Sequence, residues 1–162
     1  LWRNEAAADS TRTGIWGWSY GGFMAARALA QEAGVWAAAA AVAPVSDWRD
    51  YDTAYTERYM ELPAENEEGY EATSVVPSAD SMEDPFFLAW GTTDDNVHPV
   101  HSERLVDALI GAGHPPEVQV FPGRGHAIGD PPARTELFSA LTDFFTRHLG
   151  GPTTSTPGTA IP

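Results

Sequence analysis

Short apolar runs recur along the chain, and each is followed by a longer amphipathic stretch. The run "PFFLAWG" (85–91) is continuously apolar and stops at a glycine, which is typical of a strand buried on both faces of a parallel sheet. Further β-prone runs are "TGIWGW" (13–18) and the alternating "EVQVF" (117–121). The alanine-rich segment 35–48 is bounded by glycine and proline and is short for a helix, so we predict a buried strand there.

Helical patterns follow these runs. Residues 20–33 are rich in helix formers and precede Gly34, a residue suited to end a helix. Residues 99–113 open with a proline and close on glycines, and residues 133–149 form a strongly amphipathic last segment. The alternation of strands and helices predicts an α/β domain with a mostly parallel sheet.

Two segments between the second and third strands are less regular. Residues 50–62 predict a helix on which Tyr51 and Tyr55 lie one turn apart on the same face, with Tyr59 a turn further. Residues 63–84 are acidic and broken by proline, which predicts a loop with a short helix.

The two ends of the chain differ in composition. Residues 150–162 have the composition of a disordered tail. The predicted organisation is therefore one α/β portion over residues 1–149 followed by that tail.

Charge excludes several classes of partner. The net charge is −14, and all nine basic residues are arginines, so a nucleic-acid backbone or an anionic membrane surface would be repelled. The absence of cysteine excludes disulfides and thiolate metal sites. No apolar segment approaches the roughly 18 residues of a membrane span, and the first residues lack the layout of a signal peptide. We expect a soluble protein whose partner is not a nucleic acid.

One glycine-flanked serine carries the clearest chemical signal. Gly17-Trp18-Ser19-Tyr20-Gly21 matches G-x-S-x-G between a predicted strand and a predicted helix, where a sharp turn exposes the serine hydroxyl. We expect Gly17 and Gly21 to be glycines because side chains there would collide with neighbouring backbone. The alternative is an ordinary glycine-rich turn before a helix.

A serine nucleophile needs a base and an acid, and both follow in the expected order. Asp94 comes after the 85–91 strand and His126 after the 117–121 strand, at the carboxyl ends where open α/β sheets place their chemistry. Asp95 is nearly as good a candidate for the acid on spacing alone.

The remaining histidines have simpler interpretations. His98 and His101 are spaced as metal ligands could be, but a surface pair at a helix start is the favoured interpretation. His114 and His148 lie at predicted helix ends, where histidine often caps the helix. We therefore expect no metal and no other cofactor.

Four segments resemble the dipeptidyl peptidase IV subfamily of the prolyl oligopeptidase family of serine peptidases. They are "GWSYGGF", "APVSDWRDYDTAYTERYM" (43–60), "GTTDDNVHP" (91–99) and "FPGRGHAI" (121–128), and they occur in that subfamily's order over about residues 14–149. The tyrosine-rich segment is the most specific, because esterases with G-x-S-x-G lack it. The resemblance implies an α/β-hydrolase fold.

The resemblance also implies residue roles. It makes Asp94 the acid of a Ser19-Asp94-His126 triad, and the backbone N–H of Tyr20 an oxyanion donor. Asn96 would bond a substrate carbonyl. The residues that would line a small apolar pocket for proline or alanine are Val45, Trp48, Tyr51, Tyr55 and Val97. Without the resemblance, the tyrosines would be read as an aromatic stripe in the core.

The implied activity is release of N-terminal dipeptides ending in proline or alanine, with a peptide as substrate. Related alternatives are an acylaminoacyl peptidase or a carboxylesterase, and a further one is a partial domain without catalysis. Family members also carry a β-propeller that grips the substrate amine, the first strands of the sheet and a second oxyanion donor, none of which this sequence contains. We therefore expect these 162 residues to be inactive alone, whereas the full-length enzyme could be a homodimer.

Overall fold

Four parallel strands form the centre of the protein. The computed structural model describes residues 9, 11–32 and 34–150; the predicted tail lies, apart from Gly150, outside these residues. The strands are β1 (Gly14–Trp18), β2 (Ala38–Val42), β3 (Phe86–Gly91) and β4 (Glu117–Phe121). They pair in the order β1-β2-β3-β4, the order in which they occur in the chain. All their carboxyl ends therefore meet at one edge of the sheet.

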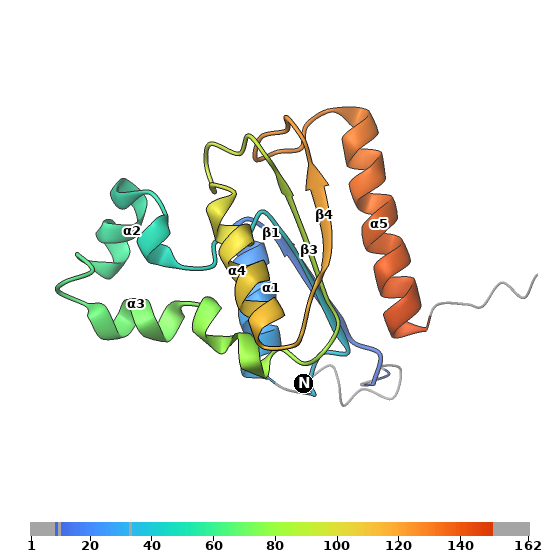
Figure 1. Ribbon diagram of the computed structural model, residues 1–162, viewed down its shortest axis with the longest axis horizontal. Coiled ribbons are helices and arrows are strands. Elements are labelled where there is room, and N and C mark those ends of the chain that lie inside the picture. Colours follow the sequence, from blue (N-terminus) through green and yellow to red (C-terminus); the bar gives the residue numbers. More distant parts are fainter. Residues whose placement is uncertain (1–8, 10, 33, 151–162) are drawn as a thin grey trace, which may run out of the picture.

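Helices cover both faces of this sheet. On one face lie α1 (Tyr20–Gln31) and α4 (Val100–Gly111), and on the other lies α5 (Pro131–Leu149) (Figure 1). Every residue of β2 is buried, with Ala39 and Ala41 in the core beneath α1 and α4, and Ala38, Ala40 and Val42 in the core beneath α5. Small side chains on this inner strand let both helical layers approach closely, so the predicted buried strand is confirmed.

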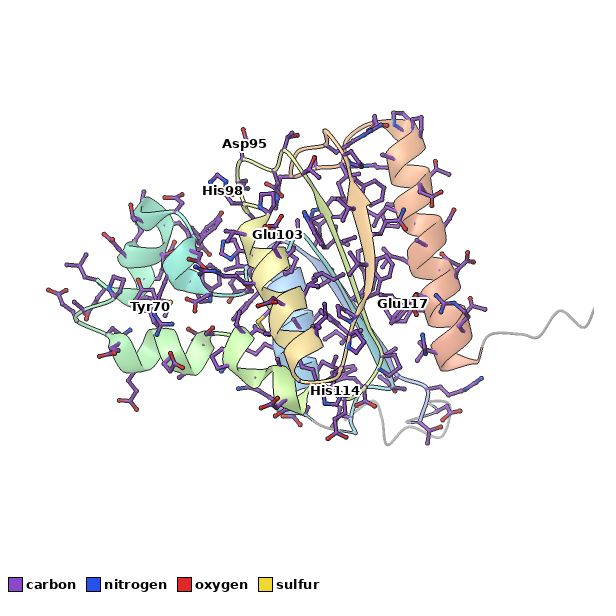
Figure 2. The ribbon with its side chains drawn as sticks, viewed as in Figure 1. Tyr70, Asp95, His98, Glu103, His114 and Glu117 are labelled. Atoms are coloured by element: carbon purple, nitrogen blue, oxygen red, sulfur yellow. The ribbon has the colours of Figure 1, made fainter. Side chains whose placement is uncertain are left out.

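An ion-pair cluster fastens α5 to the sheet. Arg147 donates from both terminal nitrogens to the two carboxylate oxygens of Glu117 on β4, at 2.8 and 2.7 Å, and His148 Nε2 lies 3.1 Å from the same carboxylate. Figure 2 shows Glu117 between β4 and α5. These hydrogen bonds, led by that of Arg147, lower the pKa of Glu117 to about 2.

The connection from β2 to β3 is more helical than predicted. It contains η2 (Trp48–Asp50), α2 (Thr53–Met60), α3 (Glu67–Thr73) and η3 (Val76–Ser81), and α2 and α3 extend beside the sheet (Figure 1). Asn66 caps α3 by accepting from the N–H of Gly69, and the buried Tyr70 donates its hydroxyl proton to Glu61 O at 2.8 Å. These local contacts hold the acidic segment in helical form.

The helix predicted for residues 50–62 is shorter than expected. The carboxylate of Asp52 accepts hydrogen bonds from the N–H groups of Ala54 and Tyr55, so α2 begins at Thr53. Tyr51 lies before it in extended backbone, so the prediction that Tyr51 and Tyr55 share one helical face is wrong. Their rings nevertheless meet, at a centroid distance of 5.6 Å.

Across residues 9, 11–32 and 34–150, no helix has both the length and the apolar character required to cross a membrane.

Candidate active site

Ser19 occupies a strained turn between β1 and α1. Its backbone has φ 58° and ψ −120°, a conformation that residues other than glycine seldom adopt. Its N–H donates to Val42 O at 2.8 Å, and its carbonyl accepts from the N–H of Phe23 at 3.0 Å. These bonds to β2 and α1 hold the turn, which leaves Ser19 partly exposed at the carboxyl edge of the sheet.

The turn requires a glycine at only one of the two flanking positions. A Cβ on Gly17 would lie 2.1 Å from the carbonyl oxygen of Gly21, so a side chain there is excluded. A Cβ on Gly21 would meet nothing within 4 Å, so the predicted collision at Gly21 is wrong. The backbone of Gly21 itself occupies the space beside Gly17. The next close approach is at Gly22, whose Cβ would lie 3.1 Å from Val42 O.

The structure pairs His126 with Asp94. His126 Nδ1 lies 2.7 Å from Asp94 Oδ2, and the other oxygen of Asp94 accepts from the N–H groups of Asn96 and Val97, at 3.0 Å each. The Asp94 side chain is fully buried, whereas the His126 side chain is 23% exposed. Asp95 is exposed on the outer side of the same loop (Figure 2). A buried carboxylate thus orients a ring whose second nitrogen is free of hydrogen bonds within the described residues.

Backbone contacts hold the loops of Asp94 and His126 against each other. A Cβ on Gly91 would lie 2.0 Å from Arg124 O, so the His126 loop touches the end of β3 directly. Thr93 N donates to Arg124 O at 3.1 Å, and Gly123 N donates to Thr92 Oγ1 at 2.8 Å. From the sequence, Gly91 was interpreted only as the end of a strand. Its place three residues before the candidate acid was the signal that could have indicated this close approach.

The Ser19 turn is also joined to the His126 loop, through the side chain of Trp18. Its Nε1 donates to His126 O at 3.0 Å, a role that sequence reasoning missed. No hydrogen bond among the described residues joins Ser19 to the His126 ring. In enzymes the bond between nucleophile and base is often long until substrate binds.

Tyr20 is the first residue of α1, so its N–H is one of the donors that a helix N-terminus leaves unpaired. The helix dipole adds partial positive charge at this end. A free donor directly after Ser19 is suited to an anionic oxygen.

Two of the other predicted pocket residues, Tyr51 and Tyr55, meet the ring of Trp48. Its ring stacks on that of Tyr55 at 6.0 Å and meets the rings of Tyr20 and Tyr51, at 5.8 Å each. Val45 and Val97 are buried in the same core cluster. A cavity of about 340 Å³ adjoins this group, but it takes in only some of the predicted residues. Its lining is Tyr20, Phe23, Trp48, Tyr55, Thr56, Tyr59, Met60 and Thr73.

Asn96 lies beside this aromatic group. The hydroxyl of Tyr51 donates to Asn96 Oδ1 at 2.7 Å, which leaves the NH₂ group of Asn96 free to donate to a ligand. Burial raises the pKa of Tyr51, and the negative charge of Asp52 raises it further. Tyr51 therefore remains a protonated donor at neutral pH.

The prediction that the two histidines at the start of α4 form a surface pair holds for only one of them. His98 is exposed (Figure 2), but His101 is fully buried because the first turn of α4 packs against Ser46 and Tyr51. Within the part of the chain that the structure describes, no group of three or more metal-binding side chains comes together. His114 follows α4 at its opposite end (Figure 2).

Comparison with known proteins identifies the family. The chain matches the prolyl oligopeptidase family over residues 1–152. It is 44% identical over 153 residues to probable dipeptidyl-aminopeptidase B of Arthroderma gypseum, and 43% identical over 153 residues to the protein of the same name from Neurospora crassa. Each alignment covers 93% of this chain and 17% of the relative. The chain thus spans less than a fifth of the length of these relatives.

A solved structure shows the same arrangement. The crystal structure of Porphyromonas gingivalis dipeptidyl peptidase 4 superposes with a TM-score of 0.88 at 35% identity, over 90% of this chain and 21% of that chain. The parallel sheet and its two helical layers therefore have the expected α/β-hydrolase arrangement. With a match over nearly all of its length, the chain belongs to the prolyl oligopeptidase family.

Proposed function

We propose that this chain carries the catalytic triad and the main substrate pocket of a serine exopeptidase that releases N-terminal dipeptides with proline or alanine at the second position. The observation that carries the proposal is the 2.7 Å hydrogen bond between His126 Nδ1 and the buried Asp94, at the sheet edge where Ser19 occupies its strained turn. The names of the similar fungal and bacterial proteins support the class of substrate.

The proposed reaction proceeds through an acyl-enzyme. Ser19 Oγ attacks the carbonyl carbon of the second residue of the substrate, while His126 Nε2 accepts the hydroxyl proton. Asp94 stabilises the imidazolium, and the N–H of Tyr20 donates to the oxyanion. His126 then protonates the leaving amine. Water, activated by the same histidine, releases the dipeptide and restores Ser19.

The pocket suits a flat, apolar residue at the second position of the substrate. The rings of Trp48, Tyr51 and Tyr55 meet at centroid distances of 5.6 to 6.0 Å and present aromatic surface against which a proline ring can pack. The free NH₂ of Asn96 supports the proposal, because it can donate to a substrate carbonyl.

Three chromogenic substrates test the proposal in the full-length protein. We expect cleavage of Ala-Pro-p-nitroanilide, little cleavage of N-acetyl-Ala-p-nitroanilide, and a loss of about three orders of magnitude or more in kcat for Ser19→Ala. Preference for the N-acetyl-Ala substrate would instead indicate an acylaminoacyl peptidase, which releases one acylated residue. Cleavage of p-nitrophenyl acetate alone would indicate a carboxylesterase, and no turnover by a folded protein would indicate a non-catalytic domain.

A further inference from the structure

His101 makes two buried hydrogen bonds to one residue of the β2–η2 loop. Its Nδ1 accepts from the backbone N–H of Ser46 at 3.3 Å, and its carbonyl accepts from Ser46 Oγ at 2.8 Å. Both residues are at most 1% exposed. The ring of His101 also lies against that of Tyr51, at a centroid distance of 6.4 Å.

These bonds join the two segments that carry the proposed pocket. Ser46 lies within residues 45–51, the segment of Val45, Trp48 and Tyr51. His101 ends residues 94–101, the segment of the triad acid, Asn96 and Val97. The segments also meet where Tyr51 bonds Asn96, and just beyond them Arg104 of α4 pairs with Asp50, but both of these contacts are exposed to solvent. The bond between Ser46 and His101 is buried, so water competes with it least.

We propose that His101 is a positioning residue that holds residues 45–51 against residues 94–101, and thereby sets the width of the substrate pocket, through an unprotonated Nδ1. This inference rests on the proposed function, because it takes the aromatic group as the substrate site. His101 itself touches no reacting atom.

The hydrogen bond from Ser46 fixes one form of the ring. A backbone N–H can donate only to an unprotonated Nδ1, so the neutral ring carries its proton on Nε2. If Nδ1 were protonated, its N–H would face the N–H of Ser46, and neither donor would have an acceptor there. Burial lowers the pKa of His101 and favours the neutral ring, as does nearby His98, whereas the charges of Asp50 and Asp47 oppose this. Nε2 is buried and has no hydrogen-bond partner among the described residues.

Two substitutions of similar size test the positioning role in the full-length protein. His101→Leu fills the space without an acceptor, and we expect it to raise KM for Ala-Pro-p-nitroanilide by about tenfold while kcat stays within about threefold. His101→Asn places an amide oxygen near the position of Nδ1 and should return KM to within about threefold of wild type. His98→Asn, which alters an exposed ring in the same segment, is the control and should leave KM unchanged.

An unchanged KM in His101→Leu, or an asparagine variant as impaired as the leucine variant, would overturn the proposal. A second measurement does not depend on activity. Ring-nitrogen chemical shifts of ¹⁵N-histidine-labelled protein at pH 7 should show His101 with the proton on Nε2. A proton on Nδ1 would contradict the role of His101, whereas a wild-type protein without peptidase activity would contradict the proposed function instead.

Discussion

The indole Nε1 of Trp18 donates a 3.0 Å hydrogen bond to the backbone oxygen of His126. Trp18 ends β1 and His126 follows β4, and these are the two outer strands of the sheet. The loop after β4 must therefore extend across the carboxyl edge of the sheet toward β1 to reach the Ser19 turn. The residue before the proposed nucleophile thus anchors the backbone of the proposed base.

We expect Trp18→Phe to lower kcat by about threefold to tenfold with little change in KM, because it removes one hydrogen bond and keeps an aromatic ring. Steady-state kinetics on Ala-Pro-p-nitroanilide measure the effect. The control is Trp16→Phe on the same strand, since Trp16 is half exposed and should tolerate the change. Equal losses in both variants would argue against the anchoring role.

The two neighbouring aspartates should differ sharply in their effect on turnover. Asp94→Asn removes the buried carboxylate that orients His126, and we expect kcat to fall by about 10⁴. Asp95→Asn changes an exposed side chain, and kcat should stay within about threefold. The reverse pattern of kcat values would exclude Asp94 as the acid.

Tyr51 should act on substrate binding through both its hydroxyl and its ring. Tyr51→Phe loses the hydrogen bond to Asn96, and we expect KM for the X-Pro substrate to rise by about threefold to tenfold. Tyr51→Ala also removes the ring and should raise KM further. If the alanine variant only melts at a lower temperature and keeps its KM, Tyr51 is a core residue rather than part of the pocket.

Gly17 and Gly21 should respond differently to alanine. Gly17→Ala places a methyl group on the backbone of Gly21, and we expect it to lower the free energy of unfolding by about 3 kcal/mol. Gly21→Ala fills open space within α1 and should raise that free energy by up to about 1 kcal/mol. Denaturant titration gives both values, and equal destabilisation would show that the turn needs both glycines.

Acid should weaken the attachment of α5 through Glu117. The pKa of Glu117 is lowered in the folded protein from 4.5 to about 2, so its contribution to stability is complete above its unfolded value. That contribution is lost as the pH falls from about 4.5 to about 2. We therefore expect Glu117→Gln to lower Tm at pH 7, and the difference from the wild type to shrink as the pH falls toward about 2.

The control for this pH series is Glu83→Gln, which changes an exposed carboxylate that has no salt bridge among the described residues. Its Tm should follow that of the wild type at every pH. A Glu117→Gln difference that is as large at pH 2 as at pH 7 would show that packing, not ionisation, is the cause.

The sequence predicted the strands well because each is encoded by its own run of residues. The continuous apolar run of β3 and the alternating run of β4 contain the period that the finished sheet requires. The alanines of β2 were ambiguous by propensity, and the length of the segment correctly favoured a strand.

Features set by distant contacts were not predictable in this way. His101 is polar and follows the exposed His98 by three residues, so only its packing against the β2–η2 loop reveals that it is buried. Similarly, Tyr51 fits a helical spacing, but the side chain of Asp52 starts the helix after it. Family resemblance supplied the proposed pocket residues, since spacing alone could not distinguish a binding surface from core aromatics.

The strand order has a consequence for synthesis on the ribosome. Because each strand pairs with the strand made just before it, the sheet can grow in one direction as the chain emerges. The serine turn leaves the ribosome first, the carboxylate loop follows, and the imidazole comes only after β4. A nascent chain thus presents Ser19 before Asp94 and His126 can reach it, and the carboxyl edge of the sheet is completed only when the loop after β4 docks on Trp18.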